Sequence, residues 1–215
     1  MDVVAQPVWE NCHLSRFEMV VKRVVDWSAA FLALVVCLPI FLFIGLAIKL
    51  DSPGPVFFIQ ARVGKRGKRF PLYKFRSMRQ DAESVRESLM HLNEASGPVF
   101  KIKNDPRVTR VGKILRKFSL DEIPQLINVL RCEMSLVGPR PPLPCEVEKY
   151  TSQEWKRLSV LPGMTCLWQI SGRSDVPFDK WVELDIEYIH RQSLWLDFKI
   201  LALTIPAVLL GRGAH

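Results

Sequence analysis

The sequence has few of the features by which cysteine and histidine residues bind metal or crosslink a chain. Its five cysteines are an odd number, and no two of them form a C-x-x-C pair. A disulfide framework or a zinc site is therefore not expected. The four histidines are scattered without the spacing of metal ligands, and we interpret them as surface or packing residues. A reduced protein that faces the cytosol is the simpler interpretation.

Internal repeats, low-complexity tracts and a cleavable export signal are also missing. Residues 1–15 are mixed in character and lack the charged region and cleavage site of a signal peptide. The length of 215 residues is typical of one domain. Within it we distinguish an N-terminal segment, residues 1–50, from the remaining residues 51–215.

Charge is absent from one long stretch of the N-terminal segment. No residue from Trp27 to Ile48 is charged. A helix over this stretch would be about 33 Å long, which is enough to span the core of a bilayer. A chain of this size could hardly bury such a helix on all sides. We therefore expect it to enter a membrane rather than to lie in a soluble core.

Pro39 lies near the middle of this uncharged stretch and predicts a bend, because a proline inside a helix removes a backbone hydrogen bond. Both flanks are basic, and basic flanks stay on the cytoplasmic side. A helix that enters and leaves the membrane by the same face satisfies both observations. The flanking cations are Arg16, Lys22, Arg23, Lys49, Arg62, Lys65, Arg66 and Lys68.

The formal net charge of the whole chain is +8. Such a balance suits nucleic acid, anionic lipid or phosphorylated substrates. The basic residues lack the interleaved aromatic platform of proteins that bind single strands, and the hydrophobic stretch also argues against nucleic acid. A non-catalytic adaptor on the membrane surface is an alternative to an enzyme, since the charge and the amphipathic ends would suit it.

A β-hairpin is predicted soon after the uncharged stretch, and further helices are predicted near the C-terminal end of the chain. Residues 56–60 and 70–75 are rich in aromatic and branched side chains, and the basic, glycine-containing residues 64–68 between them predict a β-hairpin. Helical spacing begins again at Phe178. The apolar C-terminal run is expected to lie at the membrane interface with Trp195 as an anchor, and a second transmembrane helix is the alternative.

Two adjacent carboxylates, Asp121 and Glu122, follow two cations and precede an apolar helical run. Ser119 and Glu122 have the spacing of a capping box, and Pro124 fits the first turn of a helix. We therefore expect a helix that begins between Ser119 and Asp121, with the acids at its positive end. Capping alone would explain the acid pair, so a chemical role needs further support.

Four separated cations provide that support. Lys74 and Arg76 flank one apolar residue, so both charges lie on one face of a strand end, where they could clamp a diphosphate. Arg116 lies one turn ahead of the acids on a helix expected over residues 108–118. Arg140 lies in a proline-rich segment that would hold it rigidly. A carboxylate can be a nucleophile, and magnesium prefers carboxylates with phosphate oxygens; composition alone does not choose between the acids.

Three motifs together resemble the bacterial sugar transferase family, the monotopic phosphoglycosyl transferases. They are K-F-R-S-M at residues 74–78, the acid pair, and G-P-R-P at residues 138–141. The resemblance extends over residues 17–210, so the chain resembles the catalytic core of the family standing alone. Residues 161–173, which we interpret as a loop, resemble the branch that handles hexose-1-phosphates.

The resemblance implies an enzyme that transfers a hexose-1-phosphate from a UDP-sugar to undecaprenyl phosphate and releases UMP. This reaction is the first membrane step in the synthesis of exopolysaccharide, capsule or O-antigen. The resemblance further implies that Asp121 forms a covalent phosphosugar intermediate, that Glu122 is its partner, and that Mg²⁺ lies beside Asp121. Lys74, Arg76, Arg116 and Arg140 would bind the phosphates. Whether the sugar is glucose or galactose stays open.

The resemblance also implies a fold and a location. We expect an α+β fold, mainly helical with a β-hairpin, in which the N-terminal helix re-enters the membrane and the C-terminal helices are interfacial. Many family members carry Ser-Pro at the break of the re-entrant helix, where this chain has Leu38 and Pro39. Residues 51–215 would form the catalytic domain on the cytoplasmic face of the bacterial inner membrane. A homo-oligomer is one alternative for its assembly.

Overall fold

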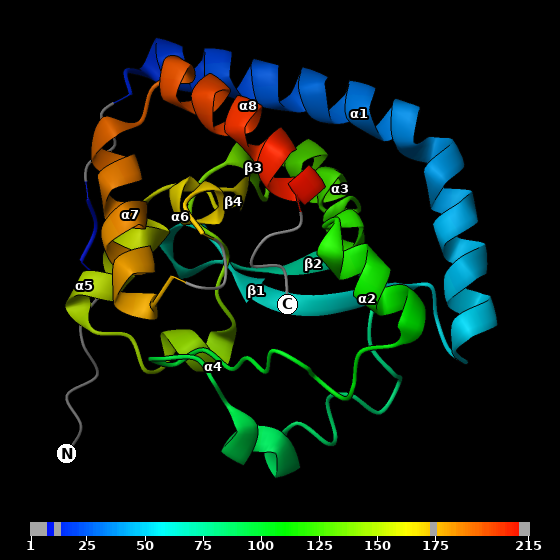
Figure 1. Ribbon diagram of the computed structural model, residues 1–215. Helices are drawn as coiled ribbons and strands as arrows, with labels where there is room; N and C mark the ends of the chain where they lie inside the picture. Colours follow the sequence, from blue (N-terminus) through cyan, green and yellow to red (C-terminus); the bar gives the residue numbers. More distant parts are fainter. Residues whose placement is uncertain (1–7, 11–13, 173–175, 211–215) are drawn as a thin grey trace.

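The computed structural model describes residues 8–10, 14–172 and 176–210. Within these residues, helices surround two small two-stranded sheets (Figure 1), which confirms the expected mixture of helix and strand. The strands are β1 (Phe57–Val63), β2 (Arg69–Phe75), β3 (Ser135–Val137) and β4 (Gly163–Thr165). The α-helices are α1 (Arg16–Asp51), α2 (Arg110–Lys117), α3 (Gln125–Leu130), α4 (Pro144–Val147), α5 (Ser152–Trp155), α6 (Leu167–Ile170), α7 (Phe178–Arg191) and α8 (Leu194–Leu210). Short 3-10 helices are η1 (Lys65–Gly67), η2 (Glu87–Leu92), η3 (Leu120–Glu122) and η4 (Lys156–Ser159).

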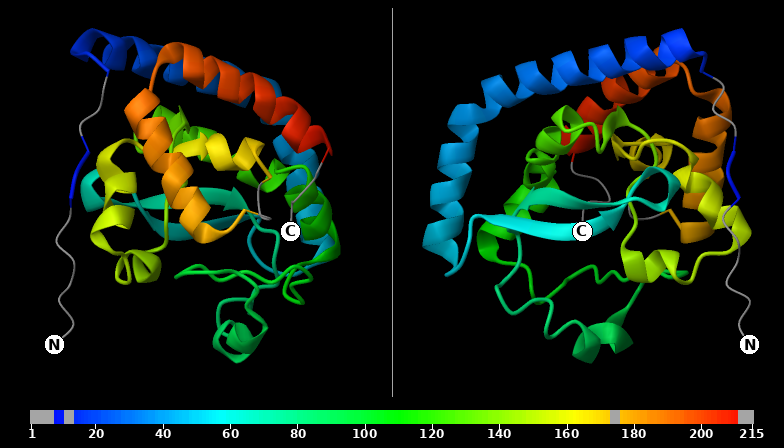
Figure 2. Two further views of the ribbon diagram at one scale, coloured as in Figure 1. Left: turned by 60° about the vertical axis from the view of Figure 1, so that its left-hand side comes forward. Right: turned by 180° about the vertical axis from the view of Figure 1, so that it is seen from behind.

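Helix α1 is long, apolar and bent. Ser15 caps its start, since its hydroxyl accepts a hydrogen bond from the backbone N–H of Glu18 at 3.2 Å. The helix continues for 36 residues with Pro39 inside it, and it turns sharply in mid-course, where a proline weakens the hydrogen-bond ladder (Figures 1 and 2). Its length and composition are sufficient to cross a membrane. The bend agrees with the expected break, while the re-entrant path stays a prediction.

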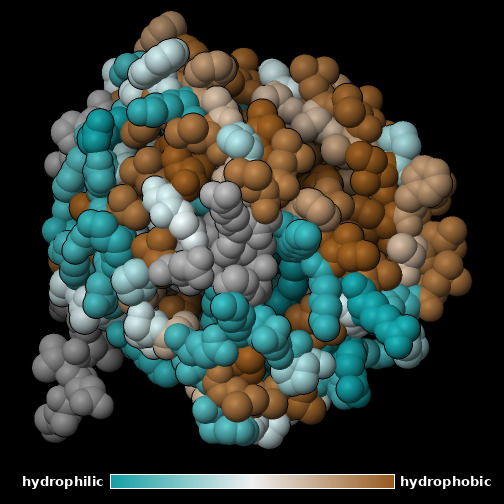
Figure 3. Space-filling model, in the orientation of Figure 1, coloured by the Kyte–Doolittle hydropathy of each residue, from teal (hydrophilic) through white to brown (hydrophobic). Residues whose placement is uncertain are grey.

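Helices α1 and α8 lie side by side along one edge of the molecule (Figure 2). Many of their large apolar side chains are exposed, among them Phe31, Val36, Trp195 and Ile205. Figure 3 shows apolar residues gathered over this part of the surface. The C-terminal helices expected from Phe178 onward are confirmed as α7 and α8. The exposed apolar surface is consistent with an interfacial position for α8, which stays a prediction.

A buried ion pair fixes the first half of α1 to α8. Lys22 Nζ lies 2.5 Å from Oδ2 of Asp197, and Tyr188 donates a hydrogen bond to the other oxygen of Asp197 at 2.7 Å. Ala30 of the same helix belongs to the hydrophobic core. The expected membrane helix is therefore packed against residues 51–210 along part of its length.

The predicted hairpin is confirmed. Strands β1 and β2 pair antiparallel, with Phe57 opposite Phe75 and Val63 opposite Arg69. The second sheet, in which β3 pairs parallel with β4, was not expected, because three-residue strands are too short to show a period. Residues 161–173 are not purely a loop, since β4 and α6 lie within them; Arg173 itself lies outside the described residues.

Asn128 joins helix α3 to strand β2. Its side-chain oxygen accepts a hydrogen bond from the backbone N–H of Tyr73 at 3.1 Å, and its amide nitrogen donates to the carbonyl of Pro71 at 2.7 Å. The side chain is completely buried, beside core residues Leu72 and Val129. These bonds fix α3 relative to β2, whose last residues Lys74 and Phe75 line the cavity described next.

Candidate active site

The acid pair lies in a tight turn between two helices. Helix α2 ends at Lys117, and Ser119 then adopts a left-handed conformation with φ 52°. Asp121 and Glu122 follow in the 3-10 turn η3. The expected capping box is wrong, because an N-cap residue needs an extended backbone and the hydroxyl of Ser119 does not cap the turn. A helical turn does begin at Leu120, with both acids in it, but it is the 3-10 turn η3, and the α-helix α3 begins only after Pro124.

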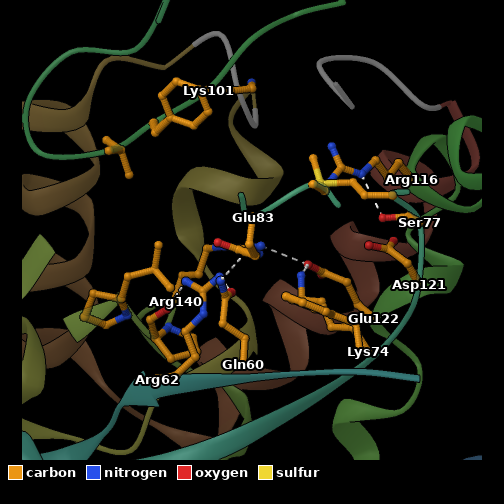
Figure 4. A pocket seen from close by; sticks show the side chains of 18 of the residues that line it. Gln60, Arg62, Lys74, Ser77, Glu83, Lys101, Arg116, Asp121, Glu122 and Arg140 are labelled. Atoms are coloured by element: carbon orange, nitrogen blue, oxygen red, sulfur yellow. Dashed lines mark hydrogen bonds and ion pairs between the residues drawn. The ribbon is translucent and has the colours of Figure 1, made fainter. Parts of the chain in front are cut away.

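All six side chains expected at the site line one cavity of about 440 Å³. Figure 4 shows Lys74 and Glu122 between two groups, with Asp121, Ser77 and Arg116 on one side and Arg140 on the other. The hairpin, α2, η3 and the proline-rich segment 138–142 each contribute to the lining. Motifs that are distant in the sequence are therefore adjacent in space.

Glu122 is held by two cations. Lys74 Nζ lies 2.8 Å and Arg140 Nη2 lies 3.0 Å from the same carboxylate oxygen, Oε1. Burial raises the pKa of Glu122, but Arg140 and Lys74 together lower it by more, so its pKa lies well below the usual range. Glu122 is therefore an anion that fixes the positions of Lys74 and Arg140.

Asp121 has a different environment. Only 7% of the residue is exposed, and within the described ranges no hydrogen bond or ion pair reaches its carboxylate. Burial raises the pKa of Asp121, and the nearby cation Lys74 offsets this only in part. The two neighbouring acids thus have pKa values displaced in opposite directions, which is typical of carboxylates with separate roles.

The remaining expected cations differ in where they point. Arg116 donates from Nε to the hydroxyl of Ser77 at 3.0 Å, beside Asp121 (Figure 4). Arg76 turns toward the loop after α1, where its guanidinium donates to the carbonyls of Ser52 and Pro53. Arg76 lines the cavity without pairing with either acid, and its role toward phosphate stays a prediction.

Sequence reasoning did not identify several polar residues of the cavity. Ser77 belongs to the K-F-R-S-M motif, so the motif itself was the signal for it. Arg62 was counted only among the basic flanks of the membrane segment, and no spacing relates it to Arg140. Lys101 lies across the cavity from the acid pair (Figure 4). Aromatic rings also line the cavity, including Trp168 and Trp181, which stack with centroids 4.2 Å apart.

The donor set of the cavity fits a magnesium ion that is bound partly by substrate. Within the described ranges, no group of three His, Cys, Asp or Glu side chains could hold a metal alone. Magnesium commonly takes one or two carboxylates and completes its shell with phosphate oxygens and water. Asp121 fits this mode because its carboxylate has no protein partner among the described residues, whereas Glu122 is already paired with two cations.

Comparisons with known proteins identify a family and several relatives of the chain. The family model described as bacterial sugar transferase matches residues 17–211. The chain is 48% identical over 197 residues to the galactosyl transferase CpsE of Streptococcus agalactiae. The matched region covers 91% of this chain and 44% of CpsE. It is 44% identical over 198 residues to the exopolysaccharide production protein ExoY of Rhizobium meliloti, covering 90% of this chain and 88% of ExoY.

A third relative is the undecaprenyl-phosphate galactose phosphotransferase of Salmonella typhimurium, 41% identical over 214 residues, or 96% of this chain and 44% of that protein. The chain thus spans less than half the length of two of these relatives and most of the length of ExoY. The three motifs that carry the family resemblance line one cavity, and the family model matches nearly the whole chain. The protein belongs to the bacterial sugar transferase family.

Proposed function

We propose that the chain transfers a hexose-1-phosphate from a UDP-hexose to undecaprenyl phosphate, in the production of an exopolysaccharide. The observation that carries the proposal is the contrast between the two acids. Asp121 has a raised pKa and a carboxylate without a partner among the described residues, whereas Glu122 is fixed between Lys74 and Arg140. The names of two relatives support it, since one is an undecaprenyl-phosphate galactose phosphotransferase and the other an exopolysaccharide production protein.

In the first step a carboxylate oxygen of Asp121 attacks the phosphorus that carries the sugar. The bond from this phosphorus to the bridging oxygen of the diphosphate breaks, and UMP leaves with that oxygen. The product is an acyl phosphate between Asp121 and the sugar phosphate, a form of covalent catalysis. Arg116 lies on the Asp121 side of the cavity and Lys74 lies at its centre, where cations stabilise the negative charge of the transferred group.

In the second step a phosphate oxygen of undecaprenyl phosphate attacks the same phosphorus. The acyl-phosphate bond breaks, the polyprenyl diphosphosugar leaves, and Asp121 is a free carboxylate again. Glu122 takes no part in bond making, because its carboxylate stays bound to Lys74 and Arg140. Its role is to hold these two cations toward the phosphates. When bound, Mg²⁺ at Asp121 would neutralise phosphate charge.

The membrane supplies the acceptor, so the position of α1 belongs to the same proposal. We propose that α1 re-enters the membrane, with both of its ends at the cytoplasmic face of the inner membrane. The bend of α1, its exposed apolar side chains and its contact with α8 support this path. Lys22 and Arg23 before the apolar stretch and Lys49 after it disfavour export of either flank.

Covalent capture of the donor tests the proposal. Purified protein is mixed with Mg²⁺ and UDP-glucose or UDP-galactose without acceptor, and mass spectrometry should find a hexose phosphate on the peptide that contains Asp121. Asp121→Asn should abolish this adduct and lower UMP release in the presence of undecaprenyl phosphate by about 10³-fold to 10⁶-fold. Asp81→Asn, a change at an exposed acid, is the control. A fully active Asp121→Asn protein would contradict the proposal, and a non-catalytic adaptor would release no UMP.

A further inference from the structure

Arg62 of strand β1 is fixed next to the proline-rich segment that carries Arg140. Its Nη1 donates to the carbonyl of Pro141 at 3.0 Å, and its Nη2 donates to Oε1 of Gln60 at 2.8 Å. One residue further, the backbone N–H of Val63 donates to the carbonyl of Pro142 at 3.0 Å. These bonds place the guanidinium groups of Arg62 and Arg140 side by side in the cavity wall (Figure 4).

The position of Arg62 leaves its charge without a counter-ion. Within the described parts of the chain no carboxylate forms an ion pair with Arg62, and its buried Nε has no hydrogen-bond partner. Two anions attract Arg62 without pairing with it: Glu146 accepts a hydrogen bond from the backbone N–H of Leu143, and Glu122 is shared by Lys74 and Arg140. A buried donor without a partner and a cation beside a cation are both unfavourable, so this wall of the cavity favours an anion.

Burial, and after it the charge of Arg140, lower the pKa of Arg62 to about 10. Arg62 therefore keeps its proton at neutral pH and adds a full positive charge to the cavity. A guanidinium with free N–H groups matches the oxygens of a phosphate, and two adjacent guanidinium groups can hold one phosphate from two sides.

The charged residues follow an order along the cavity. Arg116 is hydrogen-bonded to Ser77 beside Asp121, Arg140 is paired with Glu122, and Arg62 lies beside Arg140. Figure 4 shows the same order, with Asp121 and Arg116 on one side and Arg62 with Arg140 on the other. A phosphorus that reacts at Asp121 therefore lies apart from a phosphate bound at Arg62, so the two positions suit two different phosphate groups.

We propose that Arg62 and Arg140 form a binding site for a phosphate monoester, distinct from the position at Asp121 where the sugar phosphate is transferred. This proposal rests on the proposed function only for the identity of the ligands. Two reactants carry the required group, UMP after the first step and the polyprenyl phosphate before the second. Gln60 orients Arg62 in this site, because its side-chain oxygen accepts the hydrogen bond from Nη2.

Equilibrium binding tests the site without need of turnover. Calorimetry would measure the affinity of the detergent-solubilised protein for UMP and for farnesyl phosphate, a short lipid phosphate. Arg62→Met should weaken binding of at least one ligand by about 10-fold to 100-fold, as expected for loss of a charge-assisted hydrogen bond. Weaker UMP binding assigns the site to the nucleotide, and weaker farnesyl phosphate binding assigns it to the acceptor. The control is Arg69→Met, which removes an exposed cation of the paired strand.

Unchanged affinity of Arg62→Met for both ligands would overturn the proposal. The urea midpoint of each variant shows whether it is folded, and Arg62→Lys is the second variant if Arg62→Met does not fold. Lysine keeps the charge but loses the bidentate N–H donors of the guanidinium group. Arg62→Lys should therefore weaken binding by a smaller factor of about 3 to 10. Wild-type affinity of this variant for both ligands would also overturn the proposal. The experiment measures binding and not sugar transfer. Its result can therefore be interpreted even if the protein does not catalyse the proposed reaction.

Discussion

Lys74 Nζ donates a hydrogen bond to Oε1 of Glu122 at 2.8 Å, and this bond joins strand β2 to the turn η3. Arg140 reaches the same oxygen from the proline-rich segment. One carboxylate therefore holds together two parts of the chain that are distant in the sequence. Both side chains of the Lys74–Glu122 pair are only 15% exposed, so solvent screens the pair little.

Glu122→Gln should destabilise the protein, because it leaves Lys74 and Arg140 without their shared anion. Loss of one partner of a buried ion pair costs about 3 kcal/mol, which urea unfolding would measure. In the double variant Lys74→Met with Glu122→Gln, the loss should be smaller than the sum of the single losses. Additive losses would mean that the pair is not coupled, contrary to its geometry.

Formation of the covalent adduct should depend on pH through Asp121. Only the deprotonated carboxylate can attack, and burial raises the pKa of Asp121. The single-turnover rate should therefore fall with decreasing pH, beginning above the ordinary aspartate pKa of about 3.9. Quenched-flow measurement with UDP-hexose would record the profile. A rate that stays constant down to about pH 4 would refute the assigned environment of Asp121.

The same pKa has a consequence for stability. A carboxyl group whose pKa is raised by folding binds its proton more tightly in the folded state, so its contribution to stability is lost as the pH rises through the folded pKa. Asp121→Asn stays neutral at every pH. Relative to wild type, this variant should therefore gain stability as the pH rises through the pKa that Asp121 has in the folded protein. Urea midpoints of both proteins at several pH values would show this gain.

Gly112 allows helix α2 to approach the K-F-R-S-M motif. A Cβ atom at Gly112 would lie 1.9 Å from the backbone oxygen of Ser77, so Gly112→Ala must push the helix away. We expect a destabilisation of about 1–3 kcal/mol and a loss of activity, because Arg116 moves with the helix away from Ser77. In the control Gly45→Ala the new atom meets the side chain of Val56 at an ordinary 3.5 Å; equal effects of the two changes would contradict this account.

The path of α1 can be tested with single cysteines at Val8 and Ser88 in a background without other cysteines. If α1 re-enters, a thiol reagent that cannot cross the inner membrane should label neither site in intact cells and both sites once the membrane is opened. Labelling at residue 8 alone in intact cells would show a straight span. Pro39→Ala restores the helix ladder and should shift part of the population toward that span.

Local patterns in the sequence were sufficient for several elements. The aromatic and branched residues of the hairpin and the helix expected over residues 108–118 located β1, β2 and α2 within a few residues of their bounds. The uncharged stretch from Trp27 to Ile48 located α1 but not its start at Arg16. These patterns are readable because periodicity and charge act over neighbouring residues. The family motifs contain five of the expected site residues, and Arg116 was expected from its place one turn ahead of the acids; all six side chains line one cavity.

Other features depend on contacts between distant residues. The left-handed backbone of Ser119 replaced the expected capping box, and the sheet of β3 and β4 joins segments too short to show a period. Arg76 and Arg62 show most clearly that motifs in the sequence do not determine where a side chain points. Arg76 belongs to a motif and turns to the carbonyls of Ser52 and Pro53, whereas Arg62 belongs to no recognised motif and lies beside Arg140.

The sequence by itself thus determined which residues are charged, apolar or able to turn, and through its motifs it determined the family. Only the tertiary structure decided which cation meets which anion, because ion pairs form between segments that folding brings together. It likewise decided the division of roles between Asp121 and Glu122. The two acids are adjacent in sequence, yet burial raises the pKa of Asp121, whereas the ion pairs with Arg140 and Lys74 lower the pKa of the equally buried Glu122.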